Sequence, residues 1–367
     1  MPSTSPRTGY ARLGPLQART VLAVLVLAAV FCVGVTLSPL ASGYVGKERP
    51  GAGDMALYRA KLDRMNAGEG YYRAAGHEMR DRGYPTRSVF NWRFPLPFWL
   101  LGHLPSVDLG RGALILLALA VLLMAFEVIA REEDNRIGRA AACALLLTGP
   151  LMLSILGDLF VMPSLWAGLL IALSICAYGI DRPRLGVAAG LAAVFWRELA
   201  MPYCLVAAVL AWRNKRRGEL TAWVVGLGFF FICYALHCLH VSQLILPTDR
   251  AHAHGWIQFG GAPFVIATTQ VNAYLLLLPQ WVAALYFVAA MFGFAGWNTP
   301  LGRRAGLTAC LFVMAFAVVG QDINQYWGSL LSPILCLGIV RFPASIRDVA
   351  KAASGETRPL IIFQRED

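Results

Sequence analysis

Long apolar runs dominate the pattern of hydrophobic and polar positions along this chain. Residues 21–42, 112–130 and 220–239 are each nearly free of charged side chains. A helix of ~20 apolar residues spans the ~30 Å hydrocarbon core of a bilayer, because each residue rises by ~1.5 Å. The whole pattern predicts about ten membrane-spanning helices, near 21–42, 109–130, 139–157, 159–180, 185–197, 199–212, 220–243, 272–296, 306–321 and 327–341.

Two of these segments are too short to cross a bilayer alone. Residues 185–197 and 199–212 each reach only about 20 Å as a helix. Non-helical backbone at membrane depth is tolerated where it is buried in protein or lines a cavity. We therefore expect a helical hairpin whose tip, formed by Trp196, Arg197 and Glu198, stops below the far surface.

Lysine and arginine residues occupy alternate short loops and so predict the orientation. They occur before residue 21 and near 131–139, 182–184, 213–217 and 303–304, whereas the loops near 157–159 and 321–327 carry none. Cytoplasmic loops carry the excess of these residues. We expect one integral membrane domain over residues 1–367 in the cell (inner) membrane, with cytoplasmic tails at 1–20 and 342–367 and a large external loop at 43–108.

The external loop carries a second, shorter helical pattern. Apolar residues share one face after Asp54, and a similar face follows Gly70. Gly68 separates the two segments, and Gly83 followed by Pro85 ends the second. This spacing predicts two amphipathic helices lying along the membrane surface, with apolar positions at Met55, Tyr58, Leu62 and Met65 and then at Tyr72, Ala75 and Met79.

Composition favours the same class, an all-α integral membrane protein with a polytopic helical bundle. Apolar residues make up 57% and charged residues 14%, against about 25% charged in soluble domains. The net charge of +11 does not indicate nucleic-acid binding, because the basic residues lie between apolar runs rather than on one soluble face. All eight cysteines fall inside apolar runs, so disulfides and Cys-based metal sites are not expected.

Ionisable groups near the ends of the predicted spans are the first functional candidates, because charge within a membrane is costly. Asp158, Arg197, Glu198 and Asp322 lie at span ends that all face outside in the predicted topology, as does the loop containing Asp54. A concentration of charge on one side predicts a cavity open to the exterior.

This layout resembles the GT-C superfamily of membrane glycosyltransferases, which use polyprenyl-phosphate-linked sugars. Gly53-Asp54-Met55 stands where that superfamily has a carboxylate in the first outer loop, and the Arg197-Glu198 tip looks like similar turns in these enzymes. Asn324-Gln325-Tyr326-Trp327, followed by Leu331-Ser332-Pro333, resembles their last outer loop and span. The chain lacks the Asp-Glu pair of some GT-C families and a soluble C-terminal domain, so no family within the superfamily is assigned.

The resemblance implies an inverting glycosyl transfer on the external face, with Asp54 as the catalytic base. The acceptor would be a glycan, a lipid or a protein, the other partners would be membrane lipids and the lipid-linked sugar, and no nucleic acid is expected. The departing phosphate needs cationic donors. The candidate substrate-binding residues are Tyr71, Arg87, Trp92, Arg93, Asp158, Arg197, Glu198, Arg250, His252, His254, Asp322, Gln325 and Tyr326.

Several of these residues have a purely structural alternative. Asp54 and Asp158 could each cap the helix that follows, and Arg197 with Glu198 could be a structural ion pair. Aromatic residues such as Tyr71 and Trp92 are common as anchors at the membrane interface. Four histidines (His237, His240, His252 and His254) lie close in sequence, yet no further ligand completes a known metal spacing. No cofactor is therefore expected, and a divalent metal stays an unindicated alternative.

Two other functions remain open at this point. A transporter or flippase of a lipid-linked or anionic substrate is the main alternative, although the sequence has neither repeated halves nor charges on both sides of the midplane. A non-catalytic assembly subunit is the third. None of these patterns identifies the donor sugar, the acceptor or the length of the polyprenol.

Overall fold

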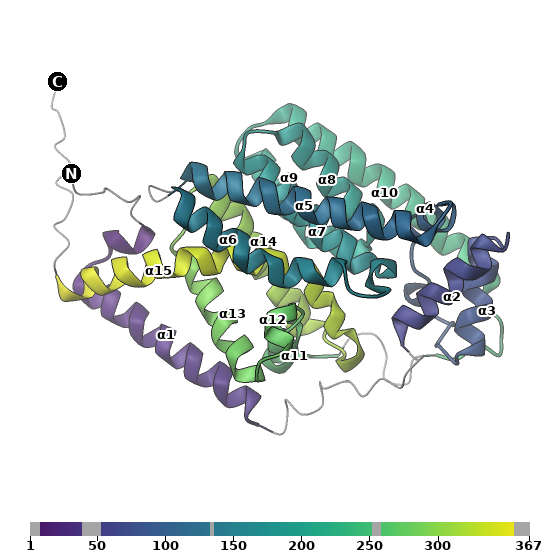
Figure 1. The fold of residues 1–367 in the computed structure, drawn as a ribbon, viewed down its shortest axis with the longest axis horizontal. Coiled ribbons are helices and arrows are strands. Elements are labelled where there is room, and N and C mark those ends of the chain that lie inside the picture. Colours follow the sequence, from purple (N-terminus) through teal and green to yellow (C-terminus); the bar gives the residue numbers. More distant parts are fainter. Residues whose placement is uncertain (1–7, 39–52, 133–135, 252–257, 356–367) are drawn as a thin grey trace.

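The structure of the protein is a computed structural model that describes residues 8–38, 53–132, 136–251 and 258–355, and all regular secondary structure in these ranges is helical (Figure 1). The predicted all-α class is confirmed. The α-helices are α1 (Pro15–Thr36), α2 (Asp54–Asn66), α3 (Tyr71–Asp81), α4 (Leu96–Gly102), α5 (Val107–Glu132), α6 (Arg136–Leu151), α7 (Pro163–Gly179), α8 (Pro183–Trp196), α9 (Met201–Arg213), α10 (Arg217–Leu244), α11 (Gly261–Thr269), α12 (Ala273–Leu276), α13 (Gln280–Ala295), α14 (Pro300–Val318) and α15 (Ser332–Ser354). Short 3₁₀ segments are η1 (Gly9–Arg12), η3 (Val89–Asn91), η4 (Met152–Ser154), η5 (Leu159–Val161), η6 (Glu198–Ala200) and η7 (Asp322–Leu330).

Several helices have the length and apolar character of membrane spans. Within the described ranges, five helices pass this test, namely Pro15–Thr36, Asp108–Glu132, Ile137–Ser154, Arg217–Leu244 and Pro300–Val318. A sixth is added if Ile323–Leu330 and Ser332–Ser354, which meet at an angle of 58°, form one broken span. The chain is therefore a multi-pass α-helical membrane protein, and the expected count of about ten spans is not reached by this criterion.

Two predicted spans are wrong in their boundaries. The segment 272–296 is interrupted between α12 and α13 at Pro279, whose backbone is extended. Proline has no N–H to donate and disfavours a helical residue before it. The segment 327–341 begins late, because α15 starts at Ser332 and continues to Ser354. The helix α11 had no counterpart among the predicted spans.

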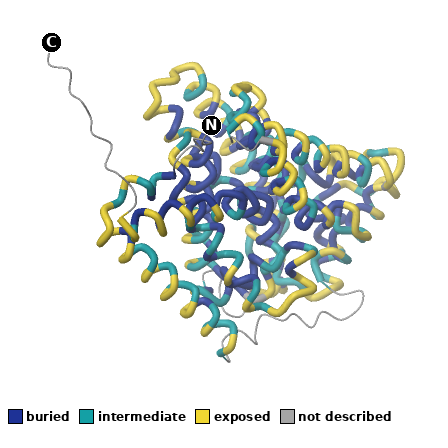
Figure 2. The backbone as a smooth tube through the Cα atoms, turned by 60° about the vertical axis from the view of Figure 1, so that its left-hand side comes forward, coloured by how far each residue is buried: buried dark blue, intermediate teal, exposed yellow. Residues whose placement is uncertain are grey.

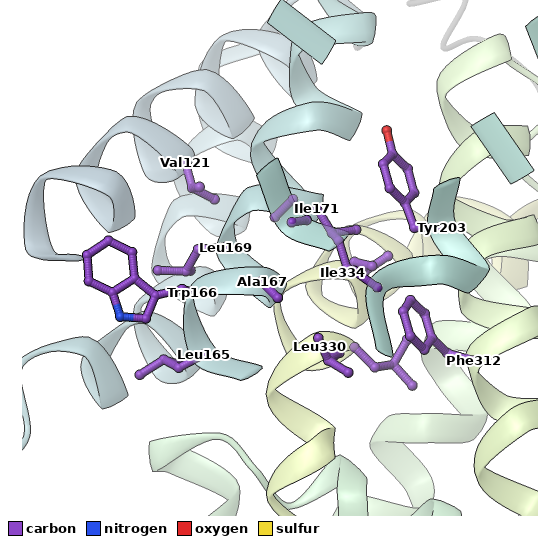
Figure 3. Packing of buried hydrophobic residues seen from close by; sticks show 14 of the residues in the cluster. Val121, Leu165, Trp166, Ala167, Leu169, Ile171, Tyr203, Phe312, Leu330 and Ile334 are labelled. Atoms are coloured by element: carbon purple, nitrogen blue, oxygen red, sulfur yellow. The ribbon is translucent and has the colours of Figure 1, made fainter. Parts of the chain in front are cut away.

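The core of the bundle surrounds α7, a helix that is buried along almost its whole length. Figure 3 shows Ala167 of α7 beside Ile334 of α15 and Leu330 of η7, with Phe312 of α14 close by. At Gly168, a Cβ atom would lie 2.0 Å from the carbonyl oxygen of Ser329. Only glycine lets η7 approach α7 this closely. Exposed residues lie on the outside of the bundle, most evidently along α1 (Figure 2).

The two helices predicted within residues 43–108 are confirmed as α2 and α3, which lie together at one end of the molecule (Figure 1). Their apolar faces pack against protein, however, and not on a lipid surface as expected. Tyr58 and Tyr71 both contact the ring of Phe98 in α4, with centroids 5.3 Å and 5.6 Å away. Met55 was placed on the buried face but is 41% exposed.

The predicted hairpin of two short helices is confirmed. It consists of α8 and α9, and Arg197 separates them with an extended backbone at φ −150° and ψ 118°. The tip is enclosed by protein, since Trp196 stacks on Trp166 of α7 with ring centroids 4.6 Å apart. The Arg197 side chain is only 3% exposed.

Candidate functional site

Asp54 lies in a cavity of about 260 Å³ at the end of the molecule formed by α2 and α3. It is the first residue of α2, and Gly53 is the N-cap, so the alternative that Asp54 itself caps the helix is wrong. Its carboxylate instead accepts a hydrogen bond of 3.2 Å from the Tyr58 hydroxyl, one turn along α2. The cavity is lined by Asp54, Leu57, Tyr58, Arg82, Gly83, Tyr84, Pro85, Asn91, Arg93, Ile323 and Asn324.

Arg93 brings a positive charge to the carboxylate, as its Nη2 atom lies 3.7 Å from Oδ2 of Asp54. Its Nε atom donates to the Tyr58 hydroxyl at 2.8 Å. The backbone that carries Arg93 is fixed from two sides, because Tyr71 donates to its carbonyl oxygen and the neighbouring Trp92 donates to Thr86 at 3.0 Å. Tyr71 is therefore a positioning residue that holds the backbone of Arg93 and does not line the cavity.

Tyr326 enters the same cluster from η7, more than two hundred residues along the chain. Its hydroxyl accepts a hydrogen bond of 3.2 Å from Nη2 of Arg93. The neighbouring Asn324 lines the cavity, whereas Gln325 is half-buried and does not. Residues of η7 therefore lie beside the cluster of Asp54 and Arg93, far away in sequence.

The hairpin tip lies beside this cluster rather than in the wall of the cavity. Arg197 and Glu198 pair with each other at 2.6 Å. The positive charge of Arg197 favours a lower pKa of the Tyr58 hydroxyl, and the negative charge of Glu198 favours a higher pKa of Arg93. Burial raises the pKa of Tyr58 well above its usual value, so its hydroxyl stays protonated and can donate to Asp54.

A buried lysine completes the surroundings of the cluster. Lys61 of α2 has no exposed surface, and its Nζ atom has no hydrogen-bond partner among the described residues. The ammonium group lies 5.4 Å from the ring centroid of Tyr58 and 5.7 Å from that of Phe98. Burial, with a further contribution from the positive charge of Arg93, lowers the pKa of Lys61 to about 7.

Other predicted site residues lie elsewhere. Asp158 precedes η5 without capping it and instead pairs with Arg59 at 3.6 Å and Arg111 at 3.5 Å, outside the cavity wall. Trp92 is 1% exposed, so its ring is a core element in this conformation and presents no face to a sugar.

Of the two remaining arginine candidates, Arg250 borders the cavity and Arg87 contacts the backbone of Arg250. Arg87 is exposed, and its backbone N–H donates to the carbonyl oxygen of Arg250 at 3.1 Å. The Arg250 guanidinium is close to Gly83, since a Cβ atom there would lie 3.3 Å from Nη1. Arg250 thus borders the cavity, and Arg87 holds the backbone of Arg250.

The candidate histidines do not form a described ligand site. His252 and His254 lie outside the described residues, as does the side chain of Asp322. His237 is 3% exposed and occupied by two contacts of 3.0 Å, with the Tyr72 hydroxyl and the Trp92 carbonyl oxygen. Within the ranges that the structure describes, no three His, Cys, Asp or Glu side chains converge as metal ligands would.

Sequence reasoning missed several residues of the cavity and its surroundings. Tyr58 was assigned only to an apolar helix face, although its spacing of four residues from Asp54 is a signal for a side-chain contact within a helix. Arg82 and Asn91 carry no local signal, because their position in the cavity depends on how the loop after α3 folds back. Lys61 could have been noticed as a charge beside Leu62 on the apolar face of α2.

Comparison with known protein families, with curated proteins and with solved structures finds no significant match for this chain.

Proposed function

We propose that this protein is a membrane glycosyltransferase that moves a sugar from a polyprenyl-phosphate donor to an acceptor hydroxyl by an inverting reaction. The observation that carries the proposal is that Asp54 and Arg93 line one cavity and that Tyr326 contacts Arg93 beside it. These residues come from the first outer loop and from the motif before the last helix, the segments that resemble the GT-C layout.

Asp54 is suited to the role of general base. Its carboxylate has an exposed fraction of 23%, so an acceptor hydroxyl can reach it. The hydrogen bond from Tyr58 and the charge of Arg93 hold one carboxylate oxygen, Oδ2, in a fixed position. In the proposed step, the other oxygen takes the acceptor proton while the acceptor oxygen forms a bond to the sugar carbon.

The bond between the sugar carbon and the donor phosphate breaks in the same step, and the phosphate leaves with the electron pair. Positive groups stabilise such a leaving group. Arg82 and Arg93 line the cavity and Arg250 borders it, so these three side chains are the proposed phosphate contacts. A cavity of 260 Å³ is just below the ~300–1,000 Å³ of most small-molecule pockets. We therefore assign it to the sugar and phosphate, with the polyprenol outside.

The test is a donor panel assayed with the purified full-length protein. Polyprenyl-phosphate sugars that differ in the sugar are incubated with the protein and a mixture of lipid and glycan acceptors, and the released polyprenyl phosphate is quantified. The proposal expects release from at least one donor, with loss of that release in Asp54→Asn. The matched control is Asp158→Asn, which changes a carboxylate outside the cavity.

The same preparation distinguishes the main alternative. A transporter or flippase would move a labelled lipid-linked substrate across a proteoliposome bilayer without releasing polyprenyl phosphate. Movement without release from any donor in the panel contradicts the proposal. Release that persists in Asp54→Asn contradicts the assigned base.

A further inference from the structure

A second and larger cavity lies between the first turns of α8 and α10. It has a volume of about 900 Å³ and shares no lining residue with the cavity of Asp54. The two cavities lie toward opposite ends of α10, because Arg217 at the start of this helix lines the larger one, whereas the carbonyl oxygen of Leu244 at its end accepts from Arg80 of α3. The 28 residues of α10 span about 42 Å, which matches a bilayer with its headgroups.

The larger cavity follows from the way the two helices meet. A Cβ atom at Gly190 of α8 would lie 2.4 Å from the Trp223 ring of α10, and one at Gly226 would lie 2.3 Å from Leu191. The helices therefore touch at this level. The cavity lies on the N-terminal side of the contact, where the first turns of both helices form its walls.

The charges are arranged around an apolar interior. Val187, Ala188, Leu191 and Ala222 supply apolar lining, while Arg184, Arg216 and Arg217 supply positive charge from both walls. Two acidic residues also line the cavity, Asp181 and Glu219. Glu219 is compensated by Arg216 at 3.5 Å and by the buried Arg304 at 3.7 Å, whereas Asp181 is exposed in the turn before α8. The three lining arginines outnumber these two carboxylates.

Arg184 and Arg217 can bind an anionic group of a ligand, because both are exposed and neither has an ion-pair partner among the described residues. Neither α8 nor α10 has a side-chain cap at its N-terminus. The partial positive charge of both helix ends adds to that of the arginines.

The surroundings favour a ligand from the bilayer over one from solution. Below the cavity, the outer face of α10 continues with Val224, Val225 and Phe229, each between 59% and 64% exposed. This helix is one of the five long apolar helices. An apolar interior with a positive rim, opening beside such a face, is complementary to an amphiphile with an anionic head.

We propose that this cavity binds one anionic phospholipid of the surrounding bilayer, with its phosphate held between Arg184 and Arg217 and the start of one acyl chain against Ala188 and Ala222. This site is independent of the proposed glycosyl transfer. Polybasic surfaces near membranes attract anionic lipid in general, whereas here a defined cavity also holds part of the acyl chain.

The test is native mass spectrometry of the full-length protein in neutral detergent, titrated with phosphatidylglycerol and, separately, with phosphatidylcholine. We expect saturable binding of one phosphatidylglycerol and much weaker binding of phosphatidylcholine. The double variant Arg184→Ala with Arg217→Ala should weaken phosphatidylglycerol binding roughly 30-fold, because each arginine near an anionic surface contributes about fivefold. The control is Arg213→Ala with Arg303→Ala, which removes the same charge from exposed positions outside the cavity wall.

A second pair of variants tests the apolar part. Ala188→Phe fills the cavity from an exposed position and should weaken binding, whereas Val225→Phe, on the outer face of α10, should leave binding unchanged. Equal loss in both double arginine variants would overturn the proposal in favour of general charge attraction. Unchanged binding in Ala188→Phe, or equal binding of both lipids, would also overturn it.

Discussion

The Nε atom of Arg93 donates a hydrogen bond of 2.8 Å to the hydroxyl of Tyr58, although the two residues are 35 positions apart. The Tyr58 hydroxyl in turn donates a hydrogen bond of 3.2 Å to the Asp54 carboxylate, so a chain of hydrogen bonds connects the arginine to the carboxylate. The chain holds the Oδ2 oxygen of Asp54 in place. Each member of this chain can be changed separately.

Tyr58→Phe removes the middle of this chain and keeps the ring that packs on Phe98. It leaves the Arg93 Nε atom without its acceptor, and hydrogen bonds to charged groups contribute about 1.5–3 kcal/mol. We expect a lower melting temperature and a turnover reduced about tenfold or more. In the control, Tyr72→Phe, the lost hydroxyl contacts His237, so melting should fall while turnover is kept. Equal turnover in the two variants would mean that Tyr58 does not orient Asp54.

The pair at the hairpin tip gives an asymmetric stability prediction. Arg197 is 3% exposed and Glu198 is 24% exposed. Glu198→Ala leaves a buried guanidinium without its partner, at a cost of about 3–5 kcal/mol, whereas Arg197→Ala leaves a carboxylate that water can reach. Thermal melting should rank Glu198→Ala lowest, Arg197→Ala next and the double variant Arg197→Met with Glu198→Ala highest. The opposite order of the two single variants would show that Glu198 is the more deeply buried partner.

Lys61 predicts a rise in stability with pH. Its pKa is about 7 in the folded protein and near 10.5 when exposed. Between these values the unfolded chain binds more protons, so the free energy of unfolding increases as the pH rises from about 7 to about 10.5. Lys61→Met removes this dependence and should melt higher than the parent at pH 7, with the gap closing toward pH 10. Lys351→Met, an exposed lysine, is the control. If the melting temperatures of Lys61→Met and the parent changed equally with pH across this range, the lowered pKa of the buried Lys61 would be contradicted.

The orientation of the chain is testable at residues from the two cavities. Gly83 lines the cavity of Asp54 and Arg217 lines the cavity between α8 and α10. The distribution of lysine and arginine predicts that the first is external and the second cytoplasmic. Reporter fusions after these residues should therefore give opposite signals. The same signal from both would contradict the topology and the external location of the proposed reaction.

The sequence predicted those features that depend on local spacing. The amphipathic α2 and α3 and the hairpin with Arg197 at its tip were found because helical periodicity and span length are written in neighbouring residues. The break at Pro279 was missed because the apolar run continues through it. The contacts of Arg93 with Tyr58 and Tyr326 could not be predicted, since they depend on the close approach of η7 to α7 and on the fold of the loop after α3. The pairing of Asp158 with Arg59 and Arg111 was not predicted for the same reason, as nothing local indicates it.

The most direct measurement is the turnover of Asp54→Asn on a donor that the parent protein uses, with Asp158→Asn as the matched control. An amide cannot accept the acceptor proton, and a positioned base contributes about 10²-fold or more. Asn nearly matches Asp in size, and Gly53, not Asp54, is the N-cap of α2, so melting should be nearly unchanged. We expect a loss of about 10²-fold or more in Asp54→Asn and near-parental release of polyprenyl phosphate in Asp158→Asn. Near-parental turnover in Asp54→Asn would contradict it.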